Sequence, residues 1–321
     1  MLRVGILTSG GDAPGLNAFL AFLRAMLTNA YGEQVEIIGF KFGYEGLCRD
    51  IWIQITSAVT TGIKRIAGSV LGCNKAFFFS AEKGKEALAT IKKHRLDALV
   101  VAGGDGTRRG LEKTLMPALK ADGYQLTLIH VSKSIDNNNA SVRSIGFYTA
   151  SQEVMSTFDK LNATAKTHRR YFIVEIMGDN SVELSLSACE GGADIIVANL
   201  GREKLSYEGL VKNVASAIAK RVAKGKDYGS VALMEKTVPN VDQFTKDVEK
   251  ILHDDFGCLE QTVRSVNPAH TLRGSVPVER DRQLANRFAF GTLEAITKKN
   301  SGTIVYNAGR TQRIAFDDDK G

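Results

Sequence analysis

Short apolar runs alternate along this chain with longer segments of helical length. Residues 2–8, 35–40 and 96–101 are mostly apolar, and each run is long enough for a buried strand but too short for a helix. Residues 19–27 and 81–94 instead have the length and spacing typical of helices. Strand-like and helical segments that follow one another in this way predict an α/β fold with parallel strands.

The same alternation continues to residue 297. We expect strands over 126–131, 170–176, 194–198 and 230–235, and helices over 151–162, 181–191, 207–223, 240–254 and 281–297. No linker rich in proline, glycine or serine separates domains. We place a boundary near Phe147, which gives a larger first domain over 1–147, a second over 148–300 and a C-terminal extension over 301–321.

Two Gly-Gly-Asp sequences each follow a strand and precede a helix. The first is S-G-G-D-A-P-G after residues 2–8, and the second is A-G-G-D-G-T after residues 96–101. The N-terminus of a helix offers N–H groups and a positive dipole end to an anion. Asp105 is then a candidate ligand for a divalent cation. Either loop alone could be an ordinary tight turn, but the pair indicates a polyphosphate at the carboxyl edge of the sheet.

A third polar segment, S-K-S-I-D-N-N-N, follows the strand expected over 126–131. Asp136 could accept a proton from a hydroxyl nucleophile, and Lys133 could neutralise phosphate charge. The alternative is an Asn-rich turn whose Asp and Asn side chains bond to their own backbone. The segment by itself leaves both interpretations open.

Composition excludes several functional classes. The chain has 321 residues, a formal net charge of +7 and four cysteines without a C-x-x-C pair. Its basic residues are dispersed, so we expect no nucleic-acid partner. No apolar run reaches the ~18 residues of a membrane span, so we expect no membrane partner. The first strand begins at once, without a signal peptide, and the separated cysteines are typical of reduced thiols. We therefore expect a cytoplasmic protein without structural zinc.

The three motifs L-T-S-G-G-D-A-P-G, G-G-D-G-T and S-I-D-N occur in this order at compatible spacing, and together they resemble the phosphofructokinase family over residues 2–292. The resemblance implies two doubly wound three-layer α/β/α domains with the active site in the cleft between them. The first domain would carry the donor-phosphate loops and the second the sugar-phosphate site. The implied reaction moves the γ-phosphoryl group of ATP, bound with Mg²⁺, to a hydroxyl of a sugar phosphate. Fructose 6-phosphate is the expected acceptor, which places the reaction in glycolysis.

The resemblance also implies a role for individual residues. Asp136 falls at the catalytic base, with Lys133 beside it, and Asp105 falls at the metal-associated acid. The implied donor-phosphate contacts are Gly11, Lys75, Gly104, Asp105, Gly106, Thr107 and Gly110. The implied sugar-phosphate contacts are Ser134, Asp136, Arg170, Met177, Gly178, Glu235, Arg264, His270 and Arg273.

The sugar-phosphate set has physical support beyond the resemblance. A phosphate dianion is held best by permanently charged, bidentate donors, and arginine supplies them. Taken singly, His270 could be a structural histidine, and Arg170 and Arg264 could be surface charges. In the family, one pair of these cationic residues comes from a neighbouring subunit, so the resemblance implies a homodimer or homotetramer with shared active sites.

Several positions depart from the usual bacterial pattern. Asn138 replaces the second aspartate of T-I-D-N-D, Asp179 stands where an arginine is common, and Lys75 replaces an arginine near the nucleotide. Stabilising a transferring phosphoryl group is mainly an electrostatic task, so such changes weigh on turnover. A catalytically weakened regulatory or binding paralogue, or a kinase of another sugar phosphate, therefore remains an alternative.

The sequence gives conflicting indications about the phosphoryl donor, and its effector site differs from that of bacterial members. Gly106 leaves room for a nucleotide where pyrophosphate-using relatives typically carry an aspartate, whereas Lys133 is typical of pyrophosphate users. We expect ATP, with pyrophosphate as the alternative donor. Ala21 lies where bacterial members carry an effector-binding arginine, and Lys224 and Lys226 partly resemble the remainder of that effector site.

Overall fold

A computed structural model describes residues 1–75, 80–137, 143–178, 182–198 and 205–316. The chain forms two compact units. Met1–Thr149 and Arg273–Gly321 form the first, and Ala150–Leu272 forms the second. The sequence suggested that residues from 273 onward divide between a second domain and a C-terminal extension, but residues 273–316 belong to the first unit. They pack with the first unit because α12 (Glu279–Thr297) lies against α1 (Leu16–Tyr31) and β11 (Gly302–Asn307) pairs with β5 (Thr127–Ser134).

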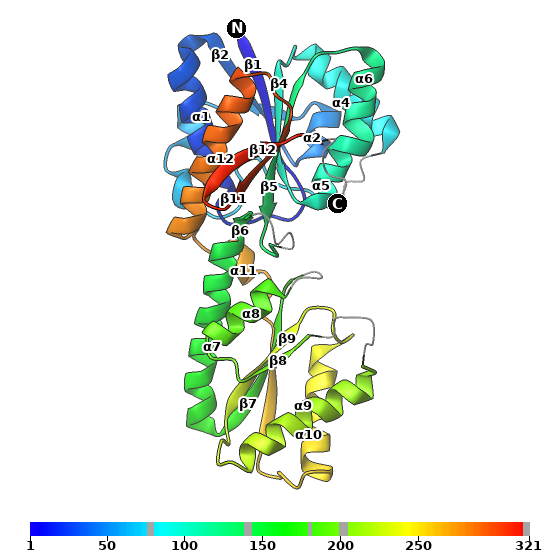
Figure 1. The fold of residues 1–321 in the computed structure, drawn as a ribbon, viewed down its shortest axis with the longest axis vertical. Coiled ribbons are helices and arrows are strands. Elements are labelled where there is room, and N and C mark those ends of the chain that lie inside the picture. The colour runs from blue at the N-terminus through cyan, green and yellow to red at the C-terminus, as the bar shows by residue number, and fades with distance from the viewer. Residues whose placement is uncertain (76–79, 138–142, 179–181, 199–204, 317–321) are drawn as a thin grey trace. The chain divides into compact units, whose positions relative to one another are not determined.

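Within the described residues of the first unit, eight strands form one sheet in the order β12-β11-β5-β4-β1-β2-β3, with β6 paired to β5 (Figure 1). The strands from β11 to β2 run parallel, and the edge strands β3 and β12 are antiparallel to their neighbours. The remaining bounds are β1 (Leu2–Thr8), β2 (Val35–Phe40), β3 (Trp52–Gln54), β4 (Ala98–Gly103), β6 (Ile145–Gly146) and β12 (Arg310–Ile314).

Helices cover both faces of this sheet and make it the middle of three layers (Figure 1). Helices α1 and α12 pack on one face through a cluster that includes Phe19, Leu23 and Phe288. The other face carries α2 (Tyr44–Arg49), α4 (Ala81–Lys93) and α6 (Met116–Asp122). Two faces of buried apolar side chains explain why β1 and β4 read as continuous apolar runs.

The described residues of the second unit hold four parallel strands in the order β10-β7-β9-β8. These are β7 (Arg170–Ile176), β8 (Ile195–Val197), β9 (Gly229–Met234) and β10 (Thr262–Val266). Helices α9 (Tyr207–Val222) and α10 (Val241–Asp254) pack on one face, around the buried Tyr171 and Phe244. Helices α7 (Phe147–His168) and α8 (Glu183–Glu190) lie on the other side (Figure 1).

Local signals set several helix starts. Ser80, Ser206 and Asn240 each accept a backbone N–H of the first turn of α4, α9 and α10. The start of α7 is held by Asp281 of α12, which accepts N–H bonds from Gly146 at 2.9 Å and from Thr149 at 2.7 Å. Burial raises the pKa of Asp281 above its usual value. These bonds fix the point at which the chain leaves the first unit.

Three expected strands, β1, β2 and β7, have the bounds that the sequence predicted. Strand β5 instead continues three residues beyond residue 131, because Lys133 and Ser134 pair with Ile145 and Gly146 of β6. Lys133 and Ser134 are therefore strand residues and not loop residues. Strands β3, β10 and β12 were not predicted, since their exposed or polar positions give no apolar run. Strand β11 was also not predicted, although its first four residues are buried.

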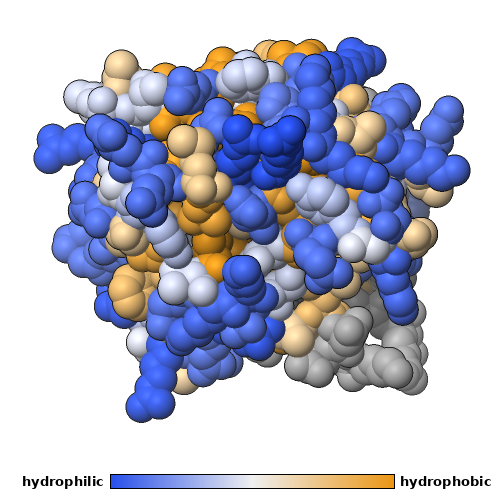
Figure 2. Space-filling model, turned by 90° about the horizontal axis from the view of Figure 1, so that it is seen from above, coloured by the Kyte–Doolittle hydropathy of each residue, from blue (hydrophilic) through white to orange (hydrophobic). Residues whose placement is uncertain are grey.

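Polar and charged side chains cover most of the face shown in Figure 2, and apolar side chains reach the surface between them. A mixture of this kind is ordinary for a folded domain. None of the helices in the described segments is long and apolar enough to cross a membrane.

Candidate active site

The first Gly-Gly-Asp loop leaves the carboxyl end of β1 and enters α1. Its backbone is joined to the next strand by the Ser9 N–H, which donates to the Ala102 carbonyl at 2.9 Å. Gly10 and Gly15 have φ values of 81° and 103°, which side chains other than glycine rarely adopt. The sequence analysis explained the glycines of such loops by the close approach of a ligand. The structure adds that the positive φ at Gly10 and Gly15 itself favours glycine.

The second Gly-Gly-Asp loop lies at the end of the neighbouring strand β4. Helix α5 (Asp105–Gly110) begins inside the motif, so Asp105 and Gly106 occupy its first turn and both are exposed. A side chain at Gly103 would lie 2.4 Å from Thr107, so this glycine is required by packing. Thr107 is buried, and its carbonyl accepts the Tyr44 hydroxyl at 2.7 Å.

A buried histidine that the sequence analysis missed supports this second loop. The Nε2 atom of His130 in β5 lies 2.9 Å from the carbonyl oxygen of Gly103, and with Nε2 protonated the ring donates this bond. The Nδ1 atom is buried without a hydrogen-bond partner among the described residues. Burial lowers the pKa of His130 to about 3, so the ring is neutral at pH 7. A histidine inside the apolar run of residues 126–131 is the sequence feature that could have indicated this buried side chain.

The third segment lies at the end of β5, next to β4. The Lys133 ammonium donates to the Gly11 carbonyl of the first loop and is buried. Burial lowers the pKa of Lys133 to about 8. Asp136 and Ser134 form a tight local turn: the Asp136 N–H donates to the Ser134 hydroxyl at 3.1 Å, and that hydroxyl donates to the Asp136 carboxylate at 3.3 Å. The turn interpretation and a base at Asp136 are thus compatible.

Arg273 lies at the same place, although the sequence assigned it to a sugar-phosphate grip. It belongs to the short helix α11 (Thr271–Gly274), and its Nη1 donates to the Asp12 carbonyl at 2.8 Å. A Cβ on Gly11 would lie 2.9 Å from this nitrogen. The structure therefore brings together Gly11, Lys133 and Arg273 in the first unit. Lys75 is exposed on the loop that follows Gly72, and Gly104 and Gly110 flank or end α5.

A second group of predicted residues meets at the carboxyl edge of the other sheet. Met177 and Gly178 follow β7, and Glu235 follows β9. The Gly178 N–H donates to the Glu235 carboxylate at 3.1 Å, and the Glu235 N–H donates to the Ile176 carbonyl at 2.8 Å. Because Gly178 has a φ of 147°, the turn favours glycine.

Glu175 is a further acid at this edge, and the sequence analysis missed it. Asn267 donates to its carboxylate at 2.6 Å. Burial, with smaller effects of the nearby Glu235 and Asp242, raises the pKa of Glu175 above its usual value. A charged residue within the apolar run of β7 is the sequence feature that could have indicated a functional role for Glu175.

The two arginines predicted to hold the sugar phosphate do not lie at this edge. Arg170 is the first residue of β7, and Arg264 pairs with Phe172 on the neighbouring β10. Arg264 is exposed, as is His270, which precedes α11. Strand register alone therefore separates these arginines from Glu235.

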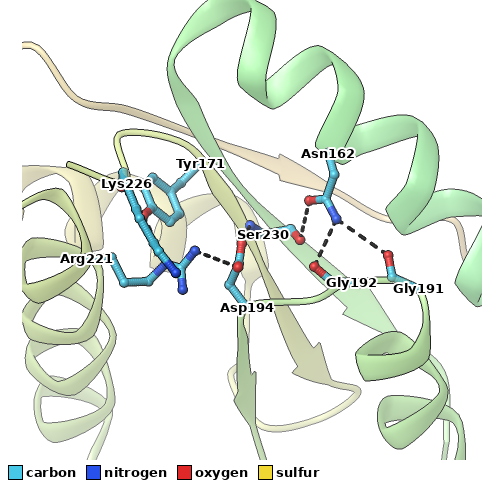
Figure 3. Close-up of polar contacts among 8 residues, drawn as sticks. All are labelled: Asn162, Tyr171, Gly191, Gly192, Asp194, Arg221, Lys226 and Ser230. Carbon is cyan, nitrogen blue, oxygen red and sulfur yellow. Dashed lines mark hydrogen bonds and ion pairs between the residues drawn. The ribbon is translucent and has the colours of Figure 1, made fainter. Parts of the chain in front are cut away.

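Lys226, whose carbonyl accepts the Tyr171 hydroxyl at 2.7 Å, lies beside a network of polar contacts (Figure 3). Arg221 pairs with the Asp194 carboxylate at 2.5 Å, and the Ser230 N–H donates to the same carboxylate at 3.0 Å. Asn162 accepts the Ser230 hydroxyl at 2.7 Å and donates to the Gly192 carbonyl at 2.9 Å. We assign this network a structural role, because its hydrogen bonds and ion pair join four segments of one unit.

The structure does not describe two of the positions that the sequence analysis singled out. Asn138 and Asp179, the two departures from the family pattern, lie outside the described residues. Among the described residues, no group of three or more His, Cys, Asp or Glu side chains could hold a metal ion. An exposed Asp105 at a strand end nevertheless fits Mg²⁺, which commonly binds one or two carboxylates, several waters and substrate phosphates.

Comparisons with known proteins agree with the family resemblance of the sequence motifs. A family model described as Phosphofructokinase matches residues 3–296. The ATP-dependent 6-phosphofructokinase of Buchnera aphidicola subsp. Acyrthosiphon pisum (strain Tuc7) is 32% identical over 321 residues, with 99% of this chain and 92% of the relative covered. The protein of the same description from Yersinia enterocolitica is 32% identical over 309 residues, covering 96% and 87%.

Solved structures agree on the fold. The T-state phosphofructokinase of Pichia pastoris has a TM-score of 0.83 at 26% identity; 99% of this chain is covered, but the match spans only 35% of the Pichia chain. A pyrophosphate-dependent phosphofructokinase from Nitrosospira multiformis has a TM-score of 0.81 at 14% identity, covering 98% and 83%. At that identity the second likeness concerns the fold alone.

Proposed function

The chain belongs to the phosphofructokinase family, and on that premise we propose that it transfers the γ-phosphoryl group of ATP to a hydroxyl of fructose 6-phosphate, giving fructose 1,6-bisphosphate. The observation that carries the proposal is the convergence of three motifs at the carboxyl ends of β1, β4 and β5. The Ser9–Ala102 and Lys133–Gly11 bonds tie these three strand ends together. Strand ends of parallel sheets are where such folds bind nucleotides.

The donor is ATP with Mg²⁺. A Cβ on Gly106 would meet nothing within 4 Å, so this position leaves space for a nucleotide. Lys133, the feature typical of pyrophosphate users, is engaged with the Gly11 carbonyl and buried. Mg²⁺ at Asp105 neutralises charge on the donor's phosphates when it is bound.

The acceptor hydroxyl is activated by Asp136, which takes its proton as the oxygen attacks phosphorus. Ser134 holds the Asp136 carboxylate through the 3.3 Å bond and fixes its direction. In the second unit, Glu235 binds a sugar hydroxyl beside the turn at Gly178. The phosphate of the sugar is held by Arg170, Arg264 and His270, with Arg273 as a further expected contact.

The site is shared between copies of the chain. Arg170 and Glu235 lie at opposite ends of the same parallel sheet, seven residues apart along the strand direction, or about 23 Å at ~3.3 Å per residue. One sugar phosphate is too small to reach both within one subunit. A neighbouring subunit that supplies Arg170 and Arg264 resolves this separation, so we propose a homodimer or homotetramer.

A coupled assay tests the proposal. The purified protein with fructose 6-phosphate, ATP and Mg²⁺ is expected to release ADP and form fructose 1,6-bisphosphate, and to do so far more slowly with pyrophosphate. A panel of other sugar phosphates defines the acceptor. Absence of turnover with every donor and acceptor would leave the binding paralogue as the correct interpretation.

A further inference from the structure

Two cationic side chains hold the backbone of the first Gly-Gly-Asp loop. Lys133 comes from β5 and donates to the Gly11 carbonyl. Arg273 comes from α11 and donates to the next carbonyl, that of Asp12, at 2.8 Å. Hydrogen bonds from charged donors are about twice as strong as neutral ones, so these two contacts constrain the loop strongly.

Gly11 makes room for one of these cations. A Cβ on Gly11 would lie 2.9 Å from Nη1 and 3.4 Å from Cζ of Arg273. A Cβ on Gly10 would lie 3.5 Å from the Lys133 ammonium, which is an ordinary van der Waals distance, so Lys133 does not require glycine at this position. The absent side chain at Gly11 is thus what admits the guanidinium, and Gly11 and Arg273 form a matched pair.

The orientation of the loop amides follows from these contacts. The C=O and N–H of one peptide plane point in opposite directions, because the unit is planar and trans. A cation on the Gly11 carbonyl therefore sets the direction of the Asp12 N–H, and one on the Asp12 carbonyl sets that of the Ala13 N–H. Fixed amide directions are what a loop needs to receive an anionic phosphate chain without reorganising.

We propose that Arg273 is a positioning residue of the donor loop, which it holds in its binding-competent conformation through the Asp12 carbonyl. This role rests on the proposed function and deepens it, since it couples Arg273 to the donor and not only to the sugar phosphate. Lys133 holds the same loop through the Gly11 carbonyl, and the absent side chain at Gly11 leaves room for the Arg273 guanidinium.

The test is direct titration of Mg²⁺-ATP binding to the full-length protein, without sugar phosphate, by calorimetry. Arg273→Ala is expected to raise the Kd for Mg²⁺-ATP by ~10-fold, the usual effect of losing one charge-assisted bond. Arg273→Lys keeps a donor and is expected to recover part of the loss. Arg280→Ala is the matched control: this arginine lies over the Tyr148 ring, 5.6 Å from its centroid, and its loss should leave the Kd unchanged.

A double-variant cycle adds a readout that a loss of general stability would not reproduce. Gly11→Ala is expected to weaken Mg²⁺-ATP binding by displacing the guanidinium, and the Gly11→Ala/Arg273→Ala double variant should bind no more weakly than the worse single variant. Effects that simply multiply would overturn the pairing of these residues. Should Arg273→Ala fail to fold, Arg273→Gln replaces it, with a Kd raised at least a few-fold.

The outcomes separate the two proposals. An Arg273→Ala protein that binds Mg²⁺-ATP as the unchanged protein does, while its KM for fructose 6-phosphate rises, would overturn the positioning role and leave the proposed function intact. If the protein without substitutions binds no Mg²⁺-ATP, both the positioning role and the proposed function are overturned.

Discussion

Arg170 and Glu235 occupy opposite ends of one parallel sheet in the second unit. Arg170 begins β7, whereas Glu235 follows Met234, the residue of β9 that pairs with Ile176 at the end of β7. Both were predicted to contact the same sugar phosphate. A parallel strand is rigid and extended, so this separation of about 23 Å, seven residues at ~3.3 Å each, is fixed by the fold.

Subunit mixing should therefore restore activity between two inactive variants. Arg170→Ala and Glu235→Ala, each inactive alone, are expected to recover roughly a quarter of full activity when coexpressed as a random two-fold dimer, because half the dimers are mixed and each has one intact site. The control is coexpression of Arg170→Ala and Arg264→Ala. Both arginines of any one site come from the same subunit, so no mixed dimer has an intact site. Recovery in the control, or none in the test pair, contradicts a shared site.

Arg264→Ala should impair the acceptor selectively. The guanidinium is exposed, and loss of a charge-assisted bond to phosphate should raise the KM for fructose 6-phosphate by ~10-fold or more. The KM for ATP should change little, and unphosphorylated fructose should be a very poor substrate of the unchanged protein. Steady-state kinetics with each substrate varied measures both effects. An unchanged KM for the sugar phosphate would remove Arg264 from the site.

Asp136→Ala should abolish most turnover while it leaves substrate binding nearly intact. General-base catalysis contributes roughly 10²–10⁴-fold, so kcat is expected to fall within that range. Ser134→Ala, which removes the hydroxyl that holds the carboxylate, should lower kcat less. A kcat above half of the original value in Asp136→Ala would show that another group takes the proton.

Donor choice should respond to Gly106 and Lys133. Gly106→Asp places a carboxylate in the open space at this glycine and should penalise ATP far more than pyrophosphate. Lys133→Gly should weaken any pyrophosphate activity, and it should also weaken ATP binding because the Gly11 carbonyl loses its cation. The measurement is kcat/KM for both donors in each variant. An equal loss with both donors in Gly106→Asp would contradict this assignment of the loop.

His130 should make the protein sensitive to acid. Burial lowers its pKa from 6.5 to about 3, so below pH 6.5 the unfolded chain binds a proton that the folded protein does not. The free energy of unfolding should therefore fall as the pH falls from about 6.5 toward 3. His130→Gln, which can still donate to the Gly103 carbonyl, should show a weaker pH dependence in urea unfolding between pH 7 and 4. Identical pH dependence in both proteins would mean that His130 is not the group responsible.

The sequence by itself determined the order of elements and the placement of the phosphate loops. Apolar runs such as β1, β2 and β7 are buried on both faces, so their length and bounds can be inferred from composition alone. The two Gly-Gly-Asp loops could be placed at strand ends because glycine, a preceding apolar run and a following helix are all local signals.

Only the tertiary structure decided which of these residues meet. The contacts of Lys133 with Gly11 and of Arg273 with Asp12 join positions 122 and 261 residues apart, and no local pattern encodes such a pairing. The return of residues 273–316 to the first unit and the separation of Arg170 from Glu235 likewise depend on strand order and register. These are set by the packing of whole elements against each other, so they appear only once the chain has folded.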